Sequence, residues 1–119
     1  MNMYLPEDNS TVEAKALPPT ISVATCSIKA AGGSIVATAK LVGKDGVDAC
    51  KISLSIQRKT ASKWISVESW TVTKDARVAS VEGKLDSAQR GTYRAKADMI
   101  ATVSGESVSV TKISNTVTV

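Results

Sequence analysis

The chain has 119 residues, of which 43% are hydrophobic and 22% are charged, which is the composition of a single globular domain. It carries 15 lysines and arginines against 11 aspartates and glutamates, a net charge of +4, and it contains no histidine. The missing imidazole excludes Ser–His–Asp and Cys–His nucleophilic catalysis and histidine-ligated metals. No apolar run approaches the roughly 18 residues that a membrane-spanning helix needs. We therefore expect neither an enzyme nor a cofactor, a metal site or a membrane span.

The first 19 residues differ in composition from the rest of the chain, because they hold all three prolines and an excess of acidic residues. We expect residues 1–19 to be a flexible tail or spacer and residues 20–119 to form one domain. No signal peptide is visible at the start of the sequence. The chain is then either a cytosolic protein or the mature segment of an exported one, and the spacer-like composition favours the second interpretation.

Hydrophobic and polar residues alternate along most of the domain, and Val, Ile and Thr are abundant, which is typical of β-strands. The first three strands are expected at residues 21–30, 34–42 and 50–57, separated by glycine-containing turns. Their inward-facing side chains are Ala24, Cys26, Ile28, Ala30, Ile35, Ala37, Ala39, Leu41, Cys50, Ile52, Leu54 and Ile56.

Four further strands are expected in the second half of the domain. Residues 64–73 pair with the third strand as a hairpin, and residues 77–85 follow, with Gly83 predicting a bulge. A sixth strand begins at Gly91, and residues 107–119 form the last strand.

The last strand changes its apolar parity between Val110 and Ile113, which predicts a second bulge near residues 111–112. Seven short strands with turns at regular spacing indicate an all-β fold, a two-sheet antiparallel sandwich, with almost no helix.

The start of the sixth strand resembles part of the immunoglobulin-like domains. Gly91-Thr92-Tyr93 before an alternating strand is similar to their tyrosine corner, in which a tyrosine bonds back to the preceding loop. The cysteine that antibody domains carry two residues later is replaced by Ala95. The resemblance implies an immunoglobulin-like sandwich without the usual inter-sheet disulfide.

A narrower resemblance covers roughly residues 20–119. The hairpin segments Ile56-Gln57-Arg58-Lys59 and Ser62-Lys63-Trp64, then Ser69-Trp70 and Gly91-Thr92-Tyr93-Arg94-Ala95-Lys96-Ala97, are similar to an uncharacterised group of short secreted proteins of Gram-positive bacteria. These are single immunoglobulin-like sandwiches behind a signal peptide. The resemblance implies export and a non-catalytic role, and it supplies no binding residues.

Cys26 and Cys50 are the two cysteines of the chain. Without a histidine or a third cysteine they cannot form a four-ligand zinc site, and their spacing excludes a C-x-x-C redox motif. They form either one disulfide or two buried free thiols. We favour the disulfide, which would stabilise the domain by about 3 kcal/mol and place the protein outside the reducing cytosol.

Trp64 and Trp70 are six residues apart on one expected strand, so regular alternation places them on the same face. Ile65 and Val67 have the opposite parity. If those two residues point inward, both indoles lie outward and form a binding face for a glycan or a protein. If the strand is bulged or its parity is reversed, at least one tryptophan fills the core of this domain, which has no Phe.

A basic stripe is a second candidate surface. Arg94 and Lys96 share a face of the sixth strand, and Lys51 lies on a neighbouring strand with Gln57 and two serines beside it. The stripe is a candidate anion-binding surface, and the alternative is an ordinary solvated sheet face.

We expect a small secreted or surface-displayed module that binds a protein or glycan without catalysis, with Trp64 and Trp70 as anchors. One alternative is a carbohydrate-binding module that uses exposed tryptophans. Another is a self-associating structural component of a cell surface or phage particle, joined through the open edge at residues 116–119. No nucleic acid partner is expected, because lysines and arginines are scattered along the chain.

Overall fold

A computed structural model describes residues 17–119 of the chain. Within this range the backbone forms eight strands and no helix. The strands are β1 (Ile21–Ala31), β2 (Ser34–Gly43), β3 (Ala49–Thr60), β4 (Lys63–Lys74), β5 (Val78–Leu85), β6 (Thr92–Val103), β7 (Glu106–Ile113) and β8 (Val117–Thr118). No helix in the described part of the chain is long and apolar enough to cross a membrane.

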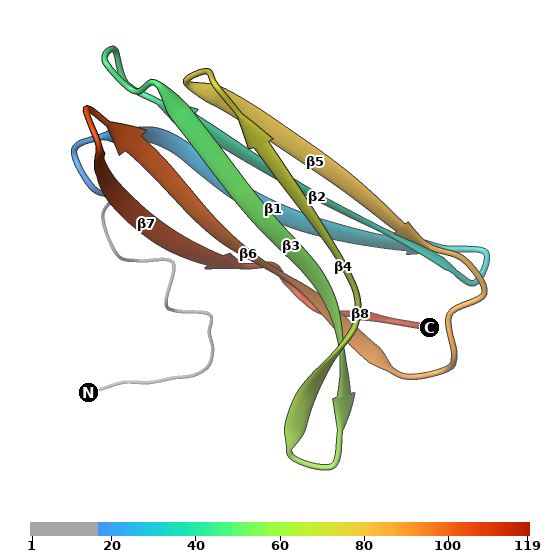
Figure 1. The fold of residues 1–119 in the computed structure, drawn as a ribbon. Coiled ribbons are helices and arrows are strands. Elements are labelled where there is room, and N and C mark those ends of the chain that lie inside the picture. Colours follow the sequence, from blue (N-terminus) through green and yellow to red (C-terminus); the bar gives the residue numbers. More distant parts are fainter. Residues whose placement is uncertain (1–16) are drawn as a thin grey trace.

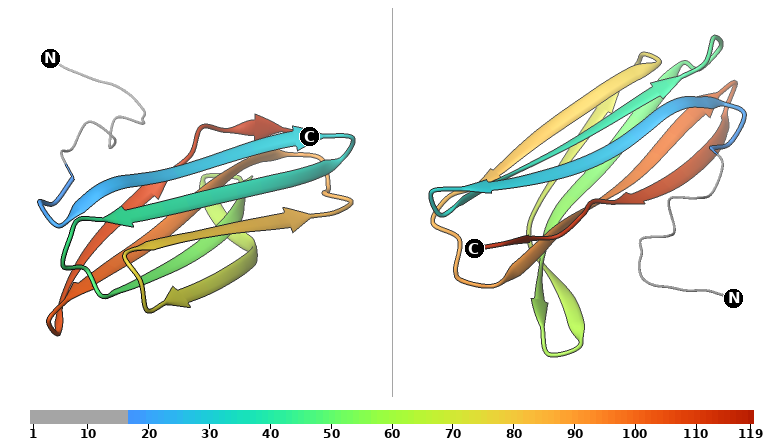
Figure 2. Two further views of the ribbon diagram at one scale, coloured as in Figure 1. Left: turned by 90° about the horizontal axis from the view of Figure 1, so that it is seen from above. Right: turned by 180° about the vertical axis from the view of Figure 1, so that it is seen from behind.

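The strands form two layers, which are seen face-on in Figure 1 and from above in Figure 2. One sheet has the order β1-β2-β5, and the other has the order β4-β3-β6-β7 with β8 also paired to β6. Every pairing is antiparallel. The expected two-sheet antiparallel sandwich is therefore confirmed, and its topology is compatible with an immunoglobulin-like fold.

The core lies between the two sheets and is made of alternate residues of the long strands. The expected inward positions of β2 and β3 are buried, as are Tyr93 and the alternate alanines of β6. The hydroxyl of Tyr93 donates a hydrogen bond of 2.6 Å to the carbonyl of Gln89 in the preceding loop. This is the contact that the resemblance to a tyrosine corner implies.

A bulge interrupts β4 in the middle of the β3–β4 hairpin. Ile56 is the register partner of Glu68, whereas the next residue of β3, Gln57, is the partner of Ser66. Val67 is therefore an extra residue, and a strand with one extra residue reverses its side-chain parity. The condition under which both tryptophans lie outward is therefore not met, and the bulged alternative applies: Ile65 and Val67 do not enter the core and are 44% and 38% exposed.

The bulge expected at Gly83 is absent. The register between β2 and β5 is continuous from the pair Ile35–Leu85 to the pair Val42–Val78. A glycine inside a strand also marks the close approach of another group, and that is its role in β5. The ring of Trp70 lies so close to Gly83 that an added Cβ would meet ring carbons at 2.2–2.5 Å.

The irregularity expected at residues 111–112 lies slightly later in the chain. β7 remains in register with β6 as far as the pair Lys96–Ile113, and the next pair is Tyr93–Val117. Two hydrogen bonds join Ser114 to Ala95 of β6 at this break. The hydroxyl of Ser114 accepts a bond from the amide of Ala95 at 2.8 Å, and the amide of Ser114 donates a bond to the carbonyl of Ala95 at 2.9 Å. The break thus splits the expected last strand into β7 and β8.

The expected disulfide is also wrong, because Cys26 and Cys50 are free thiols. Cys26 lies beside Ser114, which bonds to Ala95 of β6, whereas Cys50 is the register partner of Ala101 on that strand. Ala95 and Ala101 are six residues apart, about 20 Å along a strand. Two cysteines can be bridged only when their Cα atoms lie within about 7 Å.

The expected tail, residues 1–19, lies outside the described residues except for residues 17–19. Leu17 packs against the core, and the carbonyl of Pro18 accepts a 3.0 Å bond from the amide of Ile21. The residues just before β1 are therefore attached to the sandwich.

Candidate functional site

The two tryptophans of β4 lie on opposite faces of the five-stranded sheet. Trp64 is the register partner of Lys59, and Trp70 is the partner of the buried Leu54. Paired residues in an antiparallel sheet point to the same side, so Trp70 faces the core and Trp64 faces outward. The bulge at Val67 separates them, and no binding face contains both indoles.

Trp70 closes the seam between the two sheets where β4 passes β5. Its side chain is half-buried and packs against the core, with the ring lying over Gly83. This is the alternative in which a bulged strand directs one tryptophan inward. Trp70 has a packing role at this seam, and we do not assign it to a binding surface.

Trp64 belongs to an ordered cluster on the outer face of the sheet. The guanidinium carbon of Arg94 lies 4.3 Å from the centroid of the indole ring, in a cation–π contact. Nε of Arg94 also donates a 2.8 Å hydrogen bond to Oε1 of Gln57, whose exposure is only 9%. Burial lowers the pKa of Arg94 from its ordinary value. We call Gln57, Trp64 and Arg94 the Trp64 cluster.

The basic stripe expected from the sequence is only partly formed. Lys96 lies opposite Ser55, but Lys51 lies opposite Ile100, four positions farther along β6. Asp98 occupies the position between them and accepts a 2.7 Å bond from the Thr111 hydroxyl. The structure therefore brings Arg94 and Lys96 to one end of the face and leaves Lys51 apart from them.

The rest of this outer face is rich in hydroxyl groups. Its strand register places ten serine and threonine side chains on the side away from the core. They are Ser53, Ser55, Ser66, Ser69, Thr71, Thr73, Thr102, Ser107, Ser109 and Thr111. The Trp64 cluster is the aromatic element at one end of this polar surface.

The β3–β4 hairpin extends past the ends of the other strands, and it carries Trp64 near its tip (Figure 1, Figure 2). Ile65 and Val67 are exposed on this projecting segment. The tip itself includes Ala61 with a φ of 51°, a left-handed conformation that is typical of tight turns. The hairpin thus presents its outer face to a partner without obstruction from the three-stranded sheet.

The two thiols are unsuited to nucleophilic chemistry. Burial raises the pKa of Cys26 to about 12, although a backbone hydrogen bond from Ser114 opposes the shift. Burial also raises the pKa of Cys50. Because the thiolate is the reactive form, both groups are poor nucleophiles at neutral pH. Among residues 17–119, no three Cys, Asp or Glu side chains gather into a group that could hold a metal ion.

No protein-family model, no curated protein and no solved structure matches this chain.

The sequence singles out all three residues of the Trp64 cluster, but it does not predict the contacts between them. The pairing of Gln57 with Arg94 depends on the register between β3 and β6, which no local motif specifies.

Proposed function

We propose that this protein is a small, exported, non-enzymatic β-sandwich module that binds or displays through the outer face of its five-stranded sheet. The Trp64 cluster is the observation that carries the proposal. It holds a large aromatic side chain near the tip of a projecting hairpin, beside a guanidinium and a row of hydroxyls.

The order within the cluster favours binding. A partner loses affinity when side chains must be immobilised on contact, and an indole that is already held by Arg94 avoids much of that entropy cost. Tryptophan and arginine are also the residue types that dominate the energetics of many interfaces. The surrounding serines and threonines suit a polar partner such as a glycan.

The extracellular location rests on the resemblance to short secreted proteins of Gram-positive bacteria. The two cysteines do not support it, since they are free thiols and give no sign of an oxidising compartment. Detection of the native protein in the culture supernatant, with a cytosolic enzyme as the leakage control, tests this part of the proposal.

An array of neutral and acidic glycans, probed with labelled protein, tests the binding face. We expect the bound signal to fall on the order of tenfold in Trp64→Ala, the loss typical of a central aromatic contact. The control is Val78→Ala, which removes an exposed apolar side chain from the other sheet and leaves binding unchanged. Equal signals for all three proteins would contradict the proposal for glycans.

Self-association is a second candidate, supported by the free edge of β4. This strand ends the order of its sheet and carries the exposed Ile65 and Val67. The bulge at Val67 opposes pairing with another strand, because bulges protect open edges. Sedimentation over a concentration series distinguishes the candidates: a binding module stays monomeric, and a structural component assembles.

A further inference from the structure

The charges of the described residues are divided unevenly between the two ends of the sandwich. The end formed by the β1–β2 turn, the β3–β4 hairpin and the β5–β6 loop carries seven basic residues, which we call the basic end: Lys29, Arg58, Lys59, Lys63, Lys84, Arg90 and Arg94. Two carboxylates, Glu68 and Asp86, accompany them. The opposite end carries four carboxylates with four basic residues: Asp45, Asp48, Asp75 and Glu106 with Lys44, Lys51, Lys74 and Arg77.

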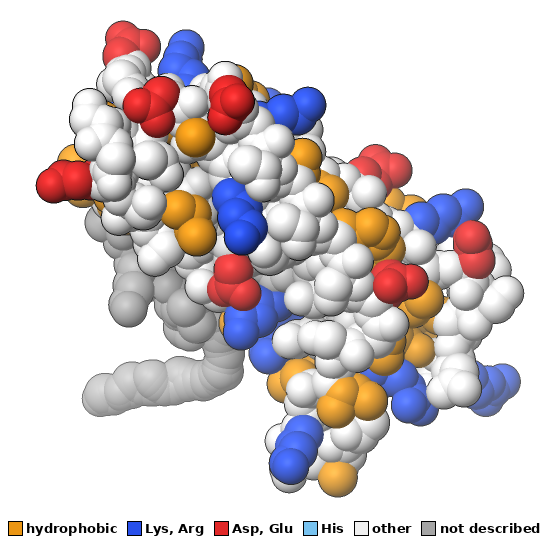
Figure 3. Space-filling view, viewed as in Figure 1, with side chains coloured by type: hydrophobic (Ala, Val, Ile, Leu, Met, Phe, Trp, Pro, Cys, Tyr) orange, Lys and Arg blue, Asp and Glu red, His pale blue; other side chains and the backbone are white. Residues whose placement is uncertain are grey.

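Figure 3 shows this polarity on one face of the molecule. Acidic side chains gather at the end away from the hairpin, with some basic ones among them, further acidic side chains lie on the right of the view beside basic ones, and the hairpin itself carries blue side chains. The whole chain has a net charge of only +4, so the local excess at the basic end is larger than the average suggests.

Hydrogen bonds link the segments of the basic end. The amide of Ala88 donates to the carbonyl of Gly33 at 2.8 Å, which ties the β5–β6 loop to the β1–β2 turn. The guanidinium of Arg58 donates from Nε and Nη2 to the carbonyl of Arg90 at 3.3 and 3.0 Å, which ties that loop to the hairpin. The backbone segments that carry basic residues of both sheets are therefore linked to one another, and the side chain of Arg58 is held in place.

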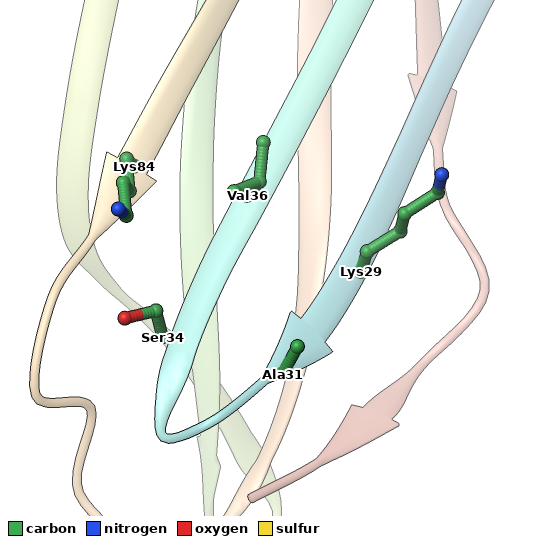
Figure 4. A pocket seen from close by; sticks show the side chains of 5 residues that line it. All are labelled: Lys29, Ala31, Ser34, Val36 and Lys84. Carbon is green, nitrogen blue, oxygen red and sulfur yellow. The ribbon is translucent and has the colours of Figure 1, made fainter.

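A groove on the outer face of the three-stranded sheet lies at the same end, but on the side of the sandwich opposite to Trp64, so it is a separate basic region. Lys29, Val36 and Lys84 are register partners across β1, β2 and β5, so two ammonium groups flank an apolar floor. Figure 4 shows Lys29 and Lys84 on either side of Val36. The groove has a volume of about 420 Å³, and Nζ of Lys84 lies 3.4 Å from a carboxylate oxygen of Asp86.

We propose that the partner is an acidic polysaccharide, which lies across the basic end and stacks a sugar ring on the exposed part of Trp64. This inference rests on the proposed function and specifies its partner. Charge complementarity supplies the attraction, and the hydroxyl-rich outer face supplies hydrogen-bonding groups that match a carbohydrate.

A nucleic acid fits the same surface less well. Proteins that bind single strands stack successive bases on several aromatic side chains, whereas Trp64, itself half-buried, is the one indole on the outer face among the described residues. Duplex binding uses a helix or a two-stranded ribbon that enters a groove together with dense lysines and arginines, and the projecting β3–β4 ribbon carries only Arg58, Lys59 and Lys63. At this end the basic residues are divided between the outer faces of the two sheets.

Two double variants distinguish the effect of charges at the basic end on binding from the effect of the net charge of the protein. Lys59→Gln with Lys63→Gln removes two charges from the hairpin, and the matched control, Lys44→Gln with Lys74→Gln, removes two from the opposite end. All four lysines are exposed. Affinity is measured at low ionic strength for heparin and polygalacturonate as acidic polysaccharides, for dextran as a neutral one, and for duplex DNA. Wild type and Trp64→Ala are titrated in parallel.

We expect both acidic polysaccharides to bind and dextran not to bind. The hairpin double variant weakens that binding on the order of tenfold and lowers its salt dependence, while the control changes affinity by less than about twofold. Equal losses in the two double variants, tighter binding of DNA than of heparin, or no binding of either acid overturns the inference. If dextran binds as tightly as the acidic polysaccharides and Trp64→Ala weakens its binding, the inference of an acidic partner is overturned, but the proposed function is left intact.

Discussion

Trp64 and Trp70 are separated by five residues of one strand, yet they lie in different environments. Trp70 closes the seam between the sheets over Gly83, whereas Trp64 lies on the outer face beneath Arg94. The difference comes from Val67, the one extra residue that reverses the parity of β4 between them. A single bulge therefore assigns one tryptophan to stability and leaves the other available for recognition.

The comparison predicts unequal effects when each indole is removed. Trp70→Ala deletes a half-buried ring from the seam, so we expect it to lower the free energy of unfolding by about 2–4 kcal/mol. Trp64→Ala is the matched control on the same strand and should cost less than about 1 kcal/mol. Urea unfolding followed by far-ultraviolet circular dichroism measures both values, and similar losses would contradict the division of roles.

Substitution of Gly83, which lies on β5 opposite Trp70, tests the packing between the two sheets. Gly83→Ala forces the Trp70 ring to move, and overpacking of this kind costs about 1–3 kcal/mol. In a Trp70→Ala background the same substitution should be nearly neutral, because the clashing ring is gone. Ser80→Ala, an exposed change on the same strand, serves as the control. An equal cost in both backgrounds would show that the indole is not what excludes a side chain at Gly83.

Arg94 tests the outer cluster. Arg94→Gln removes both the cation–π contact and the hydrogen bond to the buried Gln57, for an expected loss of about 1 kcal/mol. Lys96→Gln, two residues along the same face, should change stability by less than about 0.5 kcal/mol. If the two variants are indistinguishable in urea unfolding, Arg94 is a solvated surface residue and the cluster is not preorganised.

Alternation was enough to predict the two-layer sandwich. Burying every second side chain of β2 and β3 leaves few choices for the inner face, and the structure uses residues such as Ile35, Leu41 and Ile52 as expected. The tyrosine corner was also predictable, since Gly91 and Tyr93 form a local motif whose hydrogen-bond partner lies four residues upstream.

Bulges and long-range contacts were not predictable in the same way. Nothing in the sequence around Val67 distinguishes a bulged residue from a regular one, because the bulge is defined by register with β3. A glycine inside a strand, such as Gly83, indicates either a bulge or the close approach of another group to the backbone, and the sequence does not distinguish these two possibilities. The distance between Cys26 and Cys50 likewise depends on where each lies along its sheet.

The candidate site was predicted as a set of residue types rather than as an arrangement. Trp64, Arg94 and Lys96 do share one end of a face, but Asp98 separates that end from Lys51. The joining of basic residues from both sheets depends on contacts of the β5–β6 loop with Gly33 and the hairpin. Such contacts are set by the fold as a whole.

The indole N–H signals of the two tryptophans in a ¹H–¹⁵N NMR spectrum test the account most directly. They can be assigned with Trp64→Phe and Trp70→Phe and then followed while heparin is added to the wild-type protein. We predict that the Trp64 signal moves progressively with ligand concentration and that the Trp70 signal stays in place. Movement of the Trp70 signal alone, or no movement of either, would contradict the assignment of recognition to the outer face.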